Sequence, residues 1–205
     1  MTKALILVDL QNDFIPKGSL AVPQGNEVIA IANALPSHFE CIVATQDWHP
    51  SNHGSFAVNH PGKSVGDRIE LAGLPQVLWP VHCVQGTEGA ALVADLQQDS
   101  LTKIFQKGSD PCIDSYSGFF DNGHRKPTGL GDYLKMQHVS DVYIMGLALD
   151  YCVKYTVLDA CQLGFKTYLI EDGCRAVNLN PEDGAIAIKE MQAAGANIIQ
   201  SSYFS

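Results

Sequence analysis

The feature that most restricts the fold of this sequence is a series of short apolar runs separated by helix-like stretches. Each run is apolar at almost every position, which is typical of strands in a sheet covered on both faces. The expected strands are residues 3–8, 41–45, 103–105, 141–145 and 166–170, with a weaker sixth at 197–200. The expected helices are residues 27–35, 89–98, 130–137, 151–163 and 182–194. This alternation predicts one three-layer α/β/α domain over residues 1–205, with a mostly parallel sheet of Rossmann-like topology.

Charge and composition limit the partners and the compartment. Hydrophobic residues make up 46% of the chain, which is enough for a core, and the formal net charge is −9. A chain this acidic is a poor match for phosphate backbones or anionic membranes, so we expect no nucleic acid and no membrane as partner. The longest apolar run near the N-terminus, residues 4–8, is too short for a bilayer span or a signal-peptide core, which predicts a cytoplasmic protein.

Chemically active side chains follow four of the expected strands. Asp9 follows the first, Asp47 and His49 the second, Lys107 the third, and the segment that ends at Cys152 the fourth. In an open parallel sheet the carboxyl ends of the strands meet at one edge, where ligands bind. The sequence therefore predicts a site that combines a nucleophile, a base, a cation and metal ligands at this edge.

Cys152 is the expected nucleophile, at the start of the helix after the fourth strand. The six cysteines form no CxxC pair, so we expect free thiols, of which at most one or two are chemically active. A helix N-terminus stabilises an anion by roughly 0.3–1 kcal/mol, whereas one pKa unit requires about 1.4 kcal/mol. Activation of the thiol therefore also needs a nearby cation or base, for which Lys107 and Asp9 are the candidates; Asp13 is given a structural role.

A metal site is expected from Asp47, His49 and His82. Asp47 and His49 are two residues apart, so both can point to one side of an extended segment. His82 lies in the stretch 50–85, which is rich in Gly, His and Pro and reads as a long functional loop. Two histidines and one carboxylate suit Zn²⁺, Fe²⁺ or Mn²⁺ and leave positions open for water or a ligand. His53 and Ser55 are candidates to complete or support the site.

Taken together, these residues resemble the isochorismatase-like cysteine hydrolases and, among them, the nicotinamidase family. The resemblance runs through essentially the whole chain. The segments that carry it are Val8 to Phe14 (VDLQNDF), Gln46 to Pro50 (QDWHP), His53 to Phe56 (HGSF), Trp79 to Cys83 (WPVHC), Lys107-Gly108, Tyr116 to Phe119 (YSGF) and Gly146 to Val153 (GLALDYCV). The QDWHP and WPVHC segments are the more specific signals for nicotinamidases.

The resemblance implies hydrolysis of the linear amide nicotinamide to nicotinate and ammonia through a cysteine thioester, a step that feeds NAD salvage. An enclosed pocket of this type also predicts hydrolysis of pyrazinamide. The implied site residues are a catalytic triad (Asp9, Lys107, Cys152), metal ligands (Asp47, His49, His82), oxyanion-hole N–H groups (Ala148, Cys152) and pocket residues (Phe14, Trp79, Tyr116, Leu147). The Leu147-Ala148 peptide matches a cis bond of the family.

The sequence departs from the family at one position and leaves alternatives open. Some members use a further histidine as a fourth metal ligand, whereas here the spacing gives His53 and then Ser55, so the fourth position stays open. Another cysteine amidohydrolase, acting on carbamoyl or ureido substrates, is the alternative function, although the metal motif speaks against it. An iron oxygenase would leave Asp9, Lys107 and Cys152 unexplained. Whether the chain forms a homo-oligomer is left open.

Overall fold

Six parallel strands form the centre of the computed structural model, which describes residues 2–204. Their order across the sheet is β5-β2-β1-β6-β7-β8, and every neighbouring pair is parallel. The strands are β1 (Thr2–Val8), β2 (Cys41–Asp47), β5 (Lys103–Lys107), β6 (Val139–Leu147), β7 (Lys166–Arg175) and β8 (Asn197–Ile199). The predicted fold class is confirmed. The strand order reverses between β1 and β6, which is where doubly wound folds bind their ligands.

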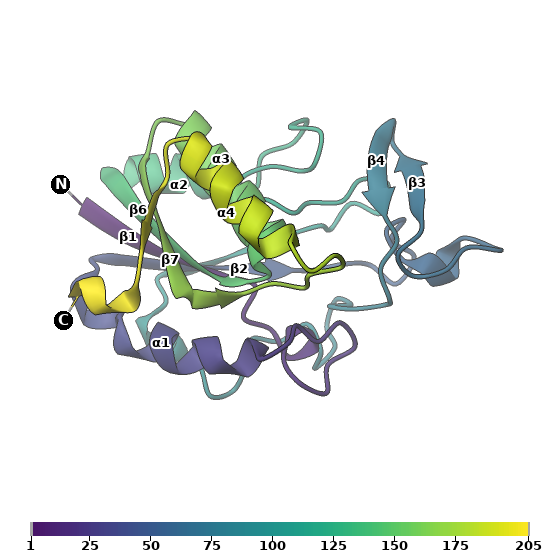
Figure 1. The fold of residues 1–205 in the computed structure, drawn as a ribbon, viewed down its shortest axis with the longest axis horizontal. Coiled ribbons are helices and arrows are strands. Elements are labelled where there is room, and N and C mark those ends of the chain that lie inside the picture. The colour runs from purple at the N-terminus through teal and green to yellow at the C-terminus, as the bar shows by residue number, and fades with distance from the viewer. Residues whose placement is uncertain (1, 205) are drawn as a thin grey trace.

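Helices cover both faces of this sheet (Figure 1). Helix α1 (Val28–Ala34) lies on one face, and α2 (Leu130–Met136), α3 (Lys154–Gln162) and α4 (Asp183–Ala193) lie on the other. The central strands are buried on both sides, as in the run from Ala4 to Val8, which explains why their sequences are almost continuously apolar.

The helix expected at residues 89–98 is wrong. This segment consists of turns, with only a 3₁₀ turn at Gln98–Ser100. Its backbone is engaged elsewhere: Ala90 O accepts hydrogen bonds from side chains, and Ala91 O accepts one from Asn12 N. The N–H of Val93 in turn donates to Leu10 O. Bonds to the loop after β1 thus replace the helical pattern that the spacing of apolar residues suggested.

A hairpin interrupts the stretch that was expected to be a long loop. Strands β3 (Arg68–Leu71) and β4 (Leu74–Val77) pair antiparallel and project to one side of the sheet (Figure 1). Ala72 and Gly73 connect them, both with positive φ, the conformation that suits a two-residue hairpin turn. The sequence did not predict this hairpin, because Gln76 is the one buried side chain of its two strands and Pro75 lies inside the second strand.

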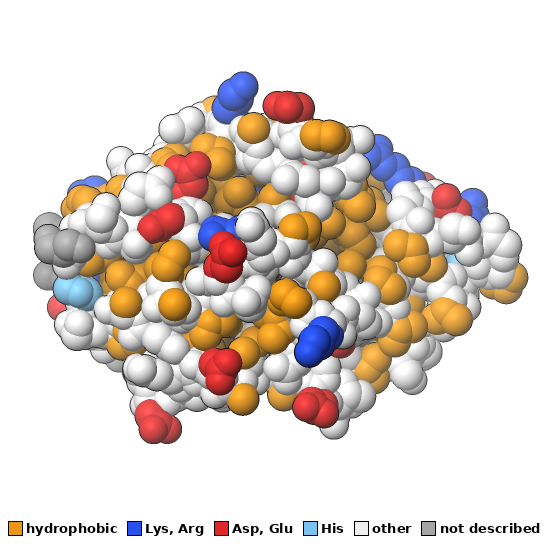
Figure 2. All heavy atoms as spheres, turned by 60° about the horizontal axis from the view of Figure 1, so that its bottom comes forward, with side chains coloured by type: hydrophobic (Ala, Val, Ile, Leu, Met, Phe, Trp, Pro, Cys, Tyr) orange, Lys and Arg blue, Asp and Glu red, His pale blue; other side chains and the backbone are white. Residues whose placement is uncertain are grey.

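Charged and apolar side chains are interspersed on the outer surface. Figure 2 shows acidic and basic side chains scattered singly over one face, with apolar side chains between them. The described part of this face therefore carries no basic stripe of the kind that tracks a phosphate backbone. Within residues 2–204, no helix combines the length and the apolar character that crossing a bilayer requires.

Candidate active site

The reversal of strand order brings the ends of β1 and β6 together, and each end delivers one reactive side chain. Strand β1 ends at Val8, and Asp9 follows in a left-handed conformation (φ 49°) that turns the chain out of the sheet. Strand β6 ends at Leu147, and Cys152 follows in a single wide helical turn, Leu149–Val153, just before α3. The peptide between Leu147 and Ala148 is cis, as the resemblance implies.

Lys107 lies at the centre of the buried charges. It ends β5, and its ammonium contacts Asp9 Oδ2 at 2.8 Å, Asp47 Oδ1 at 2.5 Å and the carbonyl of Ser115 at 2.9 Å. The same ammonium is 3.4 Å from Cys152 Sγ. Residues that are far apart in the sequence thus meet at one point. The structure brings together the three residues that the resemblance assigns to a catalytic triad.

The pKa shifts of these groups differ in a way that suits proton transfer. Burial raises the pKa of the Asp9 carboxyl, although Lys107 opposes this. Burial acts on Asp47 in the same direction, but Lys107 and then His49 outweigh it and hold its pKa well below the usual range. Burial likewise raises the pKa of the Cys152 thiol, and Lys107 counteracts the shift. Of the two carboxylates, Asp9 is therefore the one that can accept a proton.

Thr45 leaves one oxygen of Asp9 free for this role. The Thr45 hydroxyl donates to Asp9 Oδ1 at 2.6 Å and accepts from the backbone N–H of Asp9 at 3.2 Å. Within the described residues, Oδ2 of Asp9 receives no hydrogen bond of good angle. It is paired with the Lys107 ammonium, and the Cys152 sulfur lies within 4.8 Å of an Asp9 oxygen. This role of Thr45 was not predicted from the sequence, although a hydroxyl inside an otherwise apolar buried strand could have indicated it.

Asp47, His49 and His82 form a buried group whose ligand atoms lie within 4.8 Å of one another. Their chemistry fits a divalent cation. His49 Nδ1 donates to Gly108 O at 2.7 Å and His82 Nδ1 donates to Pro80 O at 2.8 Å, so in the neutral rings both Nε2 atoms present lone pairs. These lone pairs face Asp47 Oδ2 at 3.5 and 3.9 Å, an arrangement of three acceptors that a cation would satisfy.

The protonation behaviour of the two histidines agrees with this fit. Burial, together with the neighbouring His49, lowers the pKa of His82 to about 4, so His82 is neutral at pH 7. Burial also acts to lower the pKa of His49, but Asp47 reverses this and raises it, which shows that the position attracts positive charge. The residues present can thus hold a divalent metal ion.

His53 and Ser55 lie beside this group but bond to each other. His53 Nδ1 accepts the backbone N–H of Ser55 at 3.2 Å and lies 2.7 Å from its hydroxyl. A ring nitrogen that accepts a backbone N–H carries no proton, so the proton of neutral His53 is on Nε2, which then offers no lone pair. A second buried group lies beside the first: a ring nitrogen of His49, a ring nitrogen of His53 and an oxygen of Asp114 are within 4.8 Å of one another.

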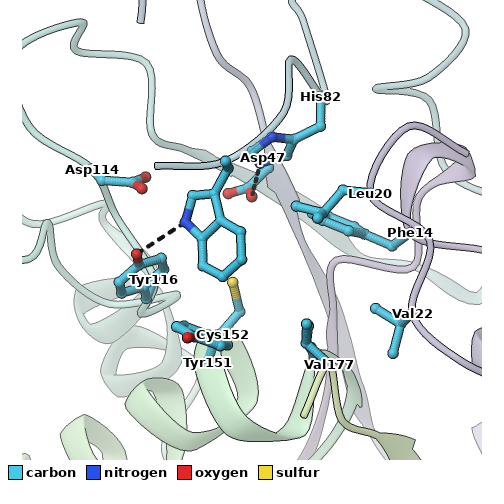
Figure 3. Close-up of a pocket in the computed structure, with 12 residues that line it drawn as sticks. Phe14, Leu20, Val22, Asp47, His82, Asp114, Tyr116, Tyr151, Cys152 and Val177 are labelled. Atoms are coloured by element: carbon cyan, nitrogen blue, oxygen red, sulfur yellow. Dashed lines mark hydrogen bonds and ion pairs between the residues drawn. The ribbon is translucent and has the colours of Figure 1, made fainter. Parts of the chain in front are cut away.

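A mostly apolar cavity opens above the sulfur of Cys152 (Figure 3). Phe14 and Leu20 line one side, and Tyr116 and Asp114 line the other. Trp79 donates from Nε1 to the Tyr116 hydroxyl at 3.1 Å, which fixes two aromatic walls relative to each other. The complete lining is Phe14, Leu20, Val22, Asp47, Trp79, His82, Asp114, Tyr116, Ala148, Tyr151, Cys152 and Val177.

Leu147 is the one predicted pocket residue that does not line the cavity. Its side chain is fully buried and lies toward Gly25, while Ala148 lines the cavity instead. Five further lining residues were not predicted from the sequence: Leu20, Val22, Asp114, Tyr151 and Val177. Of these five residues, only Tyr151 could have been predicted to line the cavity, because it directly precedes the expected nucleophile Cys152.

Gly108 gives a direct test of how the candidate metal ligand His49 is supported. It has φ +64°, and a methyl group at this position would clash with the His49 ring, 2.7 Å from Nδ1. We expect Gly108→Ala to displace His49 and to weaken zinc binding by at least about tenfold, as measured by competition with a chromophoric chelator. Gly164→Ala is the matched control, because Gly164 also has positive φ (+85°) but open space around it. Equal zinc affinity of the two variants would contradict the expected support of His49 by Gly108.

The chain is similar to known proteins along nearly its whole length. The chain is 52% identical over 200 residues to the nicotinamidase of Escherichia coli (strain K12), covering 96% of this chain and 93% of the relative. A nicotinamidase/pyrazinamidase of Acinetobacter baumanii matches the structure with TM-score 0.97 and 46% identity, over 100% of this chain and 98% of that one. A pyrazinamidase of Pyrococcus horikoshii in complex with zinc matches with TM-score 0.79 and 39% identity, over 98% and 99% of the two chains. Since the isochorismatase domain also matches residues 3–202, the chain belongs to the isochorismatase family.

Proposed function

We propose that this protein is a nicotinamidase, which hydrolyses nicotinamide to nicotinate and ammonia and also accepts pyrazinamide. One observation carries the proposal: the thiol of Cys152 lies 3.4 Å from the Lys107 ammonium, which is paired with both Asp9 and the metal-ligand candidate Asp47. The cavity above this sulfur is small, apolar and lined by aromatic rings, which suits a planar heteroaromatic amide. The relatives named above add support from their own activities.

We further propose that Asp47, His49 and His82 hold one divalent cation, with Zn²⁺ as the first candidate and Fe²⁺ or Mn²⁺ as alternatives. The acceptor atoms that face one another here support this assignment, as does the zinc complex of the Pyrococcus horikoshii relative. When bound, the cation would supply a Lewis acid that receives the ring nitrogen of the substrate and so orients the amide toward Cys152. His53 and Ser55 would support the site from outside.

Acylation then uses the groups around Lys107. Oδ2 of Asp9 takes the proton from Cys152, and the sulfur attacks the carbon of the amide. The backbone N–H groups of Ala148 and Cys152 donate to the oxygen that becomes negative; one such donor is typically worth about 3 kcal/mol of barrier. The protonated Asp9 gives its proton to the amide nitrogen, the C–N bond breaks, and ammonia leaves. The product of this half-reaction is a thioester on Cys152.

Deacylation uses the same residues in reverse. Asp9 takes a proton from a water molecule, and the resulting hydroxide adds to the carbon of the thioester. The C–S bond breaks to give nicotinic acid, which loses its proton to solvent as nicotinate, and the proton on Asp9 returns to the Cys152 sulfur. Lys107 stays protonated throughout, because Asp47 and Asp9 outweigh the effect of burial and raise its pKa well above the ordinary value. Its role is to stabilise the thiolate and both carboxylates.

The proposal is tested by measuring ammonia release from nicotinamide, pyrazinamide, benzamide and an N-carbamoyl amino acid. We expect turnover of the first two substrates. Benzamide lacks the ring nitrogen and should be turned over far more slowly, because it has no ring atom that can coordinate the cation. Preferred hydrolysis of the N-carbamoyl substrate would replace this proposal with the alternative amidohydrolase function.

Removal of the metal is expected to weaken substrate binding. Nicotinamide binding to Cys152→Ala protein can be measured by calorimetry before and after chelation, so that turnover does not interfere. We expect the Kd to rise at least about tenfold, equivalent to about 1.4 kcal/mol, when the ring nitrogen loses its partner. Added Zn²⁺ should restore the affinity. An unchanged Kd in protein shown by elemental analysis to be metal-free would contradict the orienting role.

A further inference from the structure

The backbone of Asp47 extends beyond the strand that should pair with it. The paired register of β1 and β2 ends at Leu7 and Ala44, whereas β2 continues to Asp47. At this point the side-chain amide of Gln11 takes the place of a strand. Gln11 Nε2 donates to Asp47 O at 2.8 Å, and Gln11 Oε1 accepts from Asp47 N at 2.8 Å. A carboxamide reproduces the donor and acceptor of a peptide group, so it can pair with both atoms at once.

Gln11 is itself held rigidly. Its side chain is fully buried, and the second proton of Nε2 donates to Ala90 O at 2.8 Å. The next two residues are bound to the segment around Ala90, since Asn12 N donates to Ala91 O and Asp13 N donates to Gly89 O. Both protons of the Gln11 amide are therefore used, and its position is determined by two separate parts of the chain.

Asp13 makes the corresponding contact to the other ligand segment. Its Oδ2 accepts the backbone N–H of Cys83 at 2.7 Å. Cys83 directly follows His82 and has a left-handed conformation (φ 46°), which needs support from its surroundings in a residue other than glycine. The carbonyl of Cys83 then accepts the backbone N–H of His49 at 3.0 Å. One carboxylate thus fixes the residue that links both histidine segments.

We infer that Gln11 and Asp13 are positioning residues that set the spacing of Asp47, His49 and His82 and so preorganise the metal site. The inference rests on the proposed function, which assigns the cation to these three side chains. Neither residue touches the cation site itself; both act on the backbone beside it. They lie two and four positions after Asp9, so a single short loop connects the proposed base with all three metal ligands.

The test compares zinc affinity in Gln11→Met, Asp13→Asn and a matched control, Gln46→Met. Methionine has about the size of glutamine but cannot pair with Asp47. Gln46 is also buried and donates to the same Ala90 O at 2.8 Å, but this side chain makes no hydrogen bond to Asp47. We expect Gln11→Met to weaken Zn²⁺ binding about 10- to 100-fold in a chelator competition, with Gln46→Met within about twofold of the parent protein.

Thermal unfolding without metal separates positioning from loss of stability. If Gln11→Met and Gln46→Met unfold at similar temperatures but differ in zinc affinity, the inference is supported. If Gln11→Met does not fold, Asp13→Asn carries the same test. Zinc affinity in the folded variants equal to that of Gln46→Met would overturn the inference. A parent protein that binds no zinc would overturn the proposed metal site, which distinguishes the two failures.

Discussion

Replacement of Cys152 by alanine is expected to abolish ammonia release from nicotinamide, with a loss of at least about 10⁴-fold in kcat. The reason is that no other described group lies where the sulfur does, 3.4 Å from the Lys107 ammonium at the floor of the cavity. Without the sulfur no thioester can form. Asp9 would then have only water to deprotonate, which is a much weaker nucleophile near neutral pH than a cysteine thiol.

Cys161→Ala is the matched control for this experiment. Cys161 lies on helix α3, nine residues after Cys152, and packs at the edge of the core without lining the cavity. We expect its replacement to leave kcat within about twofold of the parent. Mass spectrometry of the parent protein quenched during turnover should show the nicotinoyl adduct on Cys152. Substantial turnover by Cys152→Ala protein would contradict the thioester route.

The fold could be predicted because the physics of a buried parallel sheet leaves a strong trace in sequence. Each central strand must be apolar on both faces, so runs such as residues 3–8 and 141–145 stand out. The wrong secondary-structure predictions fall on segments whose backbone forms hydrogen bonds with distant parts of the chain. Residues 89–98 have the apolar spacing of a helix, but their backbone pairs with the loop after β1. The local sequence of residues 89–98 does not indicate that this distant loop is its hydrogen-bonding partner.

The residues of the candidate site likewise divide into those that the sequence can predict and those that it cannot. Asp9, Asp47, Lys107 and Cys152 could be located because strand ends in a parallel sheet converge by topology. Residues that reach the cavity from irregular loops, such as Leu20 and Asp114, could not, because nothing periodic specifies the path of a loop. Thr45, Gln11 and Asp13 form a third class, whose hydrogen bonds act on other residues and become visible only when the chain is folded.

Replacement of Lys107 by methionine is expected to combine loss of activity with a large loss of stability. Lys107 is the only ammonium between the buried carboxylates Asp9 and Asp47 in the described structure. Removing one partner of a buried ion pair typically costs about 3–5 kcal/mol, because the remaining charge is left uncompensated. We expect a decrease of this size in the free energy of unfolding of metal-free protein at pH 7, measured by urea denaturation.

The pH dependence of this effect has a definite sign. In the parent protein, Lys107 and His49 overcome burial and lower the pKa of Asp47, so the stability that Asp47 contributes is present at neutral pH and is lost as the pH falls below its unfolded pKa of about 3.9. In Lys107→Met protein the unpaired carboxylates have raised pKa values, so the folded state gains protons and recovers stability as the pH falls from 7 toward 4. Between pH 7 and 4 we therefore expect the free energy of unfolding of Lys107→Met protein to rise as the pH falls, whereas the Asp47 contribution in the parent stays constant over this range.

A surface lysine provides the control for Lys107→Met and shows why burial decides the outcome. Lys154 pairs with Glu190 at 3.1 Å, but half of the Glu190 side chain is exposed. Water therefore compensates the glutamate when the lysine is removed, and Lys154→Met should change the free energy of unfolding by no more than about 1 kcal/mol. If Lys107→Met were as mild as this control, the two carboxylates could coexist without a cation. Lys107 would then stabilise neither the thiolate nor the base, and the proposed chemistry would lose its central charge.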